Sequence, residues 1–262
     1  MIGRETATSP ALLAARERVI LWGGLGAITV LAWLYLVWMP MPAGTGAMER
    51  MGMAMMMPHA WTLHDALLMF AMWSVMMVAM MTPSAAPTIT MYARIAKANA
   101  VARPWYVWIF LTGYTAAWTL FSALATAVQY YLQCSEVVSD ALRAKPLLGA
   151  AILAAAGVYQ FTSLKNVCLA HCRSPLSFFL SEWRDGARGA YMMGLRHGMF
   201  CAGCCWMLMA LLFVAGVMNL AWVGAISIFV LVEKAAPGGR LVPAAAGVLL
   251  IASGAAVAVL GR

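Results

Sequence analysis

Long apolar stretches alternate with short polar connections along the whole chain. Because a helix needs about 20 apolar residues to cross the hydrocarbon core of a bilayer, each such stretch predicts a membrane-spanning helix. The stretches cover residues 19–39, 63–81, 105–132, 147–164, 197–217, 220–232 and 241–260. The sixth is short, and only Asn219 offers a turn before it. The pattern therefore predicts an all-α polytopic bundle of about seven spans, or six if residues 197–232 cross only once.

Two connections and one proline-rich break stand out between these stretches. Residues 40–62 and 165–196 form the longer connections, and Pro83 and Pro87 are expected to end the second helix. Residues 177–193 mix aromatic with charged side chains, which favours a helix lying at the membrane interface. No soluble domain is evident, so residues 1–262 are expected to form a single integral membrane domain.

Basic residues are distributed unevenly between the two sides of this layout. With a cytoplasmic N-terminus, the inner segments hold 13 of the 17 Lys and Arg residues. Cytoplasmic loops carry an excess of these residues. We therefore expect the N-terminus and residues 165–196 to be cytoplasmic, with residues 40–62 and the C-terminus outside.

Composition supports contact with the lipid bilayer rather than with nucleic acid. Only 10% of the residues are charged, against roughly 25% in soluble domains. The net charge of +8 is scattered between apolar spans, whereas nucleic-acid binding requires a basic stripe or patch. Within the spans, Glu233 could pair with Lys165 or Lys234, and Gly194 with Gly198 would permit close approach of another helix.

Five of the six cysteines and two histidines fall within 38 residues. His197, Cys201 and Cys205 recur at every fourth position and Cys204 follows Cys201 by three, so one helix face would carry all four. A second group contains Cys168, His171 and Cys172, whose two thiols share a face if the fourth helix persists past Lys165. Antiparallel packing of the two helices would bring both groups together near the cytoplasmic boundary.

Thiolate and imidazole ligands favour soft or borderline ions such as Cu(I) and Zn(II) over Mg and Ca. Tetrahedral zinc takes four ligands, and this segment offers more, which suits two ions or the passage of one. The alternative is that cysteine acts as a small hydrophobe without a chemical role, and we favour a structural role for Cys134.

Methionines form a second group of soft ligands. Of 22 in the chain, 14 lie between Met39 and Met81. Thioether sulfur prefers Cu(I), although methionine also fills helix cores. Weaker candidate ligands in the outer connection and at the start of the second helix are Met51, Met53, Met55, Met56, Met57, His59 and His64. A stripe on the second helix adds Met69, Met72, Met76 and Met80.

Three strings and a final Glu-Lys pair carry a resemblance to a known family. They are MMTPSAAP at 80–87, YQFTSLKNVCLAHCRSPL at 159–176, GMFCAGCCWMLMALLFVAGVMNLAW at 198–222, and Glu233 with Lys234. About residues 60–235 thus resemble the predicted metal-binding integral membrane proteins, a bacterial family with a domain of unknown function. The resemblance implies a multi-pass inner-membrane protein. The metal ligands it implies are Cys168, His171, Cys172, Cys201, Cys204 and Cys205.

Three functions remain open on these residues. The first is a non-enzymatic copper-handling or transport protein that collects Cu(I) outside and passes it along the methionines to the cysteines. The second is a membrane thiol-disulfide oxidoreductase. The third is a structural zinc site in a membrane assembly factor. The expected partner would be a membrane complex for this third function and a metallochaperone for the copper function. The sequence makes no prediction of the metal's direction of movement or of the oligomeric state.

Overall fold

The structure, a computed structural model, describes residues 10–38, 62–98, 103–135, 146–217, 219–236 and 239–260. These residues form helices and connections without a strand, which confirms the all-α prediction. The helices are α1 (Pro10–Trp38), α2 (Leu63–Ala98), α3 (Tyr106–Cys134), α4 (Pro146–Tyr159), α5 (Ser163–Arg173), α6 (Pro175–Glu182), α7 (Gly186–Ala210), α8 (Leu212–Ala215), α9 (Leu220–Ala235) and α10 (Leu241–Leu260).

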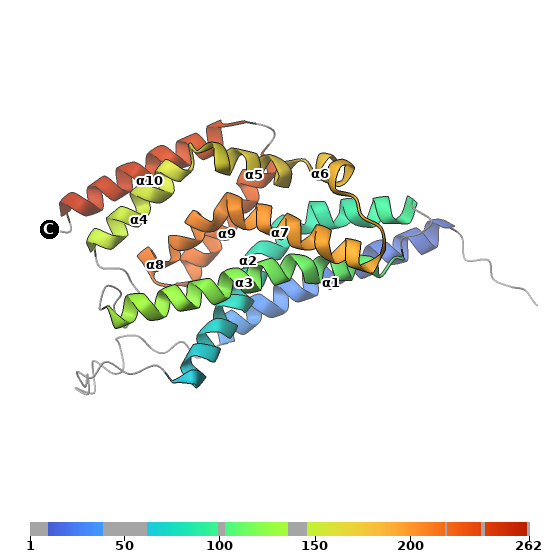
Figure 1. The fold of residues 1–262 in the computed structure, drawn as a ribbon, viewed down its shortest axis with the longest axis horizontal. Helices are drawn as coiled ribbons and strands as arrows, with labels where there is room; N and C mark the ends of the chain where they lie inside the picture. The colour runs from blue at the N-terminus through green and yellow to red at the C-terminus, as the bar shows by residue number, and fades with distance from the viewer. Residues whose placement is uncertain are drawn as a thin grey trace, which may run out of the picture.

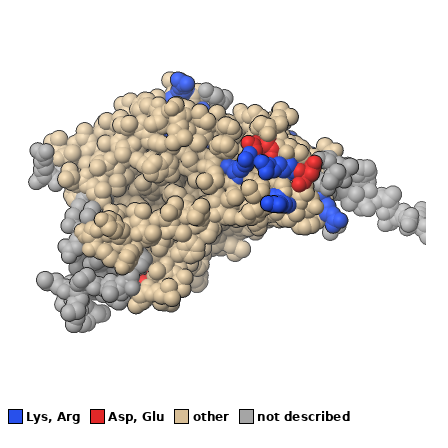
Figure 2. Space-filling model, in the orientation of Figure 1, with Lys and Arg blue, Asp and Glu red and all other residues tan. Residues whose placement is uncertain are grey.

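The bundle is elongated, with α1, α2, α3 and α7 running along its length (Figure 1). Helices α4 and α10 lie side by side on one flank, and α5 and α6 continue from α4 towards the end where α7 begins. The C-terminus lies at the end opposite the start of α1. Lys, Arg, Asp and Glu gather near α6 and the start of α7, while most of the remaining visible surface that is described carries no charge (Figure 2).

Five of the described helices are long and apolar enough to cross a membrane, and the bent pair α4–α5 makes a sixth candidate. Helix α9 has 16 residues and is shorter than a typical span. As expected, Asn219 begins this helix, because its side chain accepts a hydrogen bond from the Trp222 amide at 3.2 Å. The count of seven spans and their orientation stay predictions.

Helix α2 differs from the sequence prediction because it continues through Pro83 and Pro87 to Ala98. A proline inside a helix removes one backbone donor and disturbs the preceding turn, but neighbouring side chains can satisfy the backbone there. The Met81 carbonyl accepts from Tyr114 at 3.1 Å and from Ser84 at 2.9 Å. The Met80 carbonyl accepts from Ser227 at 3.3 Å. Tyr114 of α3 and Ser227 of α9 thus contact α2 just before Pro83, in a segment that the sequence alone marks as a break.

The fourth predicted span also differs, because it does not persist past Lys165 as one helix. Helix α4 ends at Tyr159, and α5 begins at Ser163 after a bend of 65°. Thr162 starts α5 by accepting a hydrogen bond from the Lys165 amide at 3.3 Å. A polar cap thus begins a new helix that still carries Cys168 and Cys172 at a spacing of four.

The segment between α5 and α7 packs against the bundle. Helix α7 begins at Gly186, eleven residues before the predicted start at His197. Phe178 and Phe179 of α6 are buried, and Phe179 packs near Tyr92 of α2 with ring centroids 5.8 Å apart. Leu180 on the same helix is 80% exposed. Contact of α6 with the membrane interface therefore stays a prediction.

Helices α3 and α7 approach each other at glycines, as the sequence predicted for Gly194 and Gly198. A Cβ atom at Gly194 would overlap the Phe110 carbonyl oxygen, and one at Gly198 would lie 2.6 Å from the Ala117 Cβ. Gly113 of α3 faces the Tyr191 carbonyl with similarly little space. This close contact fixes the position of α7, which carries His197, Cys201, Cys204 and Cys205.

Candidate metal centre

Four thiols from two helices meet in the interior of the bundle. The Cys172 side chain on α5 lies close to the Cys201 and Cys204 side chains on α7. Cys205 makes similar contacts with Cys201 and Cys204. Cys172 is 9% exposed and the three thiols on α7 are fully buried. We call Cys172, Cys201, Cys204 and Cys205 the thiol cluster.

A lysine, a tyrosine and a serine complete the surroundings of Cys201. The Lys234 Nζ atom donates hydrogen bonds to Cys201 Sγ and to Ser84 Oγ, each at 2.9 Å. The Tyr114 hydroxyl lies 3.1 Å from the same sulfur. An ammonium at this distance balances the negative charge of a thiolate. Sequence reasoning did not assign these three residues to the site, although the Glu-Lys pair and the MMTPSAAP string contain two of them.

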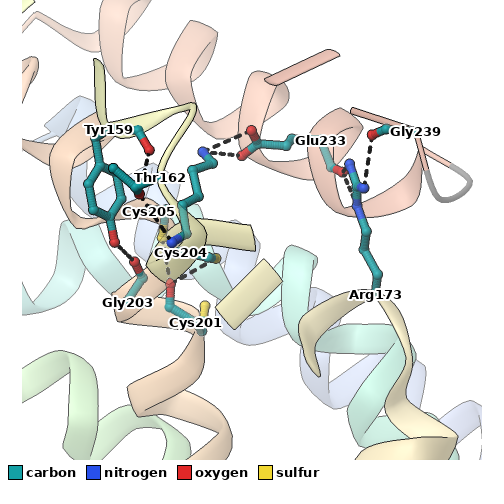
Figure 3. A network of polar contacts seen from close by, with 10 residues as sticks. Tyr159, Thr162, Arg173, Cys201, Gly203, Cys204, Cys205, Glu233 and Gly239 are labelled. Atoms are coloured by element: carbon teal, nitrogen blue, oxygen red, sulfur yellow. Dashed lines mark hydrogen bonds and ion pairs between the residues drawn. The ribbon is translucent and has the colours of Figure 1, made fainter. Parts of the chain in front are cut away.

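A buried ion pair lies beside the thiol cluster. Lys165 Nζ on α5 is 2.8 Å and 3.0 Å from the two carboxylate oxygens of Glu233 on α9. Arg173 donates to the Glu233 backbone carbonyl at 2.7 Å and 3.0 Å. Figure 3 shows Glu233 and Arg173 on one side of this network and the thiols of α7 on the other. Of the two partners that the sequence offered for Glu233, the structure thus selects Lys165.

Both candidate histidines have aromatic neighbours. The His197 ring lies 5.4 Å from the Phe178 ring and 5.8 Å from the Tyr114 ring, and its buried Nδ1 atom has no hydrogen-bond partner. His171 stacks on Phe200 at 4.2 Å and its Nδ1 contacts the Val167 carbonyl at 2.9 Å. In the described part of the chain, no hydrogen bond joins either imidazole to a thiol. Their role as ligands stays a prediction.

The thiols are close together but do not all point to one centre. Cys204 and Cys205 direct their sulfurs to the Cys201 carbonyl oxygen, at 3.1 Å and 2.9 Å. Among the residues that the structure describes, no group of three or more His, Cys, Asp or Glu side chains is arranged to hold a metal ion. Binding by more than two thiols therefore requires these side chains to rotate away from the carbonyl.

The methionine stripe of α2 is part of the core. Met72, Met76 and Met80 are buried, while Met69 is half-buried and its sulfur lies 3.4 Å from Gln129 Nε2. The stripe ends beside the thiol cluster, because Tyr114 contacts both the Met81 carbonyl and Cys201. His64 is exposed at the start of α2. The remaining candidates lie outside the described residues: Met51, Met53, Met55, Met56, Met57 and His59.

Comparison with known protein families gives a match that covers most of the chain. A family model described as a copper chaperone, PpoB2, matches residues 70–257. No curated protein and no solved structure matches the chain. The matched region runs from α2 to α10 and contains every residue of the thiol cluster, together with Lys234 and Tyr114.

Proposed function

We propose that this chain, which belongs to the PpoB2 copper chaperone family, binds copper as Cu(I) at the thiol cluster. We further propose that it passes the ion through a membrane-embedded helix bundle. The observation that carries this proposal is the meeting of four buried thiols from α5 and α7 around Lys234. Copper handling follows from the family. The oxidation state, the ligands and the transport step are inferred from the chemistry of the residues.

The donor set fits Cu(I) better than harder ions. Sulfur ligands select Cu(I) and zinc, while Mg, Ca and Mn prefer oxygen. The buried carboxylate of Glu233 is paired with Lys165 at 2.8 Å. Cu(I) accepts as few as two thiolates, and Cys172 lies close to both Cys201 and Cys204, so a pair of ligands from α5 and α7 needs little rearrangement. Zinc would need four ligands and hence a larger rearrangement of Cys204 and Cys205.

Lys234 makes it easier to hold a charged metal–thiolate group away from water. A buried charge is tolerated when it is paired and hydrogen-bonded. A Cu(I) ion with two thiolates carries one negative charge, which the Lys234 ammonium neutralises. Its hydrogen bond to Ser84 at 2.9 Å holds the ammonium beside the cluster.

The methionine stripe supports a route to the cluster. Neutral thioethers bind Cu(I), and ion passage requires sites that also release the ion. Met80 lies next to Met81, whose carbonyl accepts a hydrogen bond from Tyr114, and the same Tyr114 hydroxyl contacts Cys201. An ion released at the inner end of the stripe would therefore meet thiolates next. Ligand charge therefore rises along the proposed route.

Equilibrium competition with a chromophoric Cu(I) chelator tests the proposal on detergent-purified protein. We expect the wild type to retain Cu(I) and the C201S/C204S/C205S variant to lose most of it. The matched control is C134S, because Cys134 is an exposed free thiol at the end of α3. Undiminished Cu(I) binding in the triple variant would contradict the assignment. Zinc retained in place of copper would instead favour the structural zinc interpretation.

A further inference from the structure

A cavity of about 470 Å³ lies outside the thiol cluster, between α5, α6 and α7. Its walls contain Cys168 from α5, Glu182 from α6, and Arg196, Met199 and Phe200 from α7. Cavities of roughly 300–1,000 Å³ accommodate small molecules. The volume therefore fits a metabolite-sized ligand rather than part of a folded protein domain.

Cys168 connects this cavity with the thiol cluster. It forms part of the cavity wall and precedes Cys172 by one helical turn on α5. Its sulfur also lies against α7, because a Cβ atom added at Gly203 would be only 2.8 Å away. Gly203 directly precedes Cys204. A metal ion on Cys168 is thus one helical turn from Cys172 and next to the α7 thiols.

The cavity also presents one acidic and one basic group side by side. Glu182 and Arg196 form an ion pair whose side chains are 24% and 44% exposed. Both charges therefore remain partly accessible to solvent. A ligand with an ammonium and a carboxylate would match Glu182 and Arg196, while its apolar atoms would contact Phe200 and Met199.

We propose that this cavity is a transfer port where Cu(I) is exchanged between Cys168 and a small zwitterionic thiol, such as an amino acid or short peptide with a free sulfhydryl. This inference rests on the proposed function, since it requires that the thiol cluster holds Cu(I). In the loading direction, the bond from copper to the carrier sulfur breaks and a bond to Cys168 Sγ forms. The Cys168 proton passes to the departing carrier thiolate, and copper remains Cu(I), so no electron is transferred.

Stopped-flow transfer to the purified full-length protein tests the port. The probes are Cu(I) complexed with cysteine and Cu(I) complexed with 2-mercaptoethanol, an uncharged thiol. We expect a fast phase with the cysteine complex that C168S abolishes, and a slower transfer from the uncharged complex. C134S, which removes the exposed thiol at the end of α3, is expected to retain the fast phase.

Two variants of the ion pair separate charge recognition from folding. E182Q/R196Q is expected to transfer copper from both probes at similar rates, whereas E182R/R196E exchanges the charges and is expected to recover the preference for cysteine. An unchanged fast phase in C168S, or an unchanged preference in E182Q/R196Q, would overturn the port. If the wild type binds no Cu(I) at equilibrium, the proposed function itself fails, which is a different result.

Discussion

Lys234 has an ammonium group whose two acceptors are the Ser84 hydroxyl and the Cys201 sulfur, at 2.9 Å each. Among the described residues, no carboxylate lies within ion-pairing distance of it. Buried charges in proteins are generally paired, so the thiol cluster is its natural source of negative charge. One residue thereby links α9 with α2 and α7 at the centre of the proposed copper site.

Replacing Lys234 with methionine is expected to weaken copper binding. The K234M variant keeps much of the side-chain volume but removes the charge that balances a Cu(I)–thiolate group. We expect the dissociation constant for Cu(I) to rise by roughly 10-fold to 100-fold, as for other groups that support metal ligands. Chelator competition measures it, with K97M as the control because Lys97 is exposed at the end of α2. Equal affinity in wild type and K234M would exclude this role.

Helical spacing was sufficient to predict that the three cysteines of α7 lie on one side of the helix. Because Cys201, Cys204 and Cys205 recur at three and four residues, a helix must place them on one side, and the structure buries all three. Tyr114 and Lys234 were not predicted as neighbours of Cys201, because their contacts depend on how α3 and α9 pack against α7. Sequence separation of 87 and 33 residues leaves no local pattern that reports such contacts.

Helix boundaries could likewise be predicted where the local sequence pattern sets them, but not where packing against other helices sets them. The predicted stretch 241–260 coincides with α10, because its length is set by an uninterrupted apolar run. Helix α2 continues through Pro83 next to donors from α3 and α9, and no local signal reveals these contacts. Likewise, the bend between α4 and α5 contains neither glycine nor proline within residues 160–162.

The contact between α3 and α7 predicts a stability effect at Gly194. In G194A the added methyl group would overlap the Phe110 carbonyl, and backbone atoms cannot move aside as a flexible side chain can. We expect the free energy of unfolding to fall by about 1–3 kcal/mol, the usual cost of overpacking a core. The midpoint of denaturant unfolding in detergent measures the change.

A matched control for this substitution lies in α1. A Cβ atom at Gly26 would have no heavy atom within 4 Å, so G26A makes the same chemical change in a helix without the clash. Its unfolding midpoint should stay at or above that of the wild type, because alanine favours helix formation. Equal stability of G194A and G26A would show that α3 and α7 are not held at this distance.

The whole molecule combines a nearly uncharged body with a charged end near α6 (Figure 2). Under the predicted orientation this end faces the cytoplasm, and α6 contributes Glu182 to the proposed transfer port. The proposed methionine route then leads from the opposite side towards the thiol cluster. The direction of the bundle in the membrane therefore decides which compartment exchanges copper at the port.

Reporter fusions test this orientation. With seven spans, a reporter fused after Ser135 or after Arg262 should be outside, and one fused after Arg184 should be cytoplasmic. Alkaline phosphatase, which is active only outside, and green fluorescent protein, which folds only inside, give complementary readouts. A cytoplasmic C-terminus, combined with an outside position after Ser135 and a cytoplasmic position after Arg184, would contradict seven spans. Only two of α7, α9 and α10 could then cross, which would exclude the short α9 as a crossing helix.

If α9 crosses the membrane, as the prediction of seven spans requires, its short length makes the protein sensitive to membrane thickness. Its 16 residues extend about 24 Å at the helical rise per residue, whereas the hydrocarbon layer is roughly 30 Å thick. A bilayer adapts to such hydrophobic mismatch by thinning locally. Since α9 ends in Glu233 and Lys234, thinning would bring lipid headgroups and water closer to the sulfur atoms. Lipids with longer acyl chains should therefore slow access to the copper site without any change in the protein.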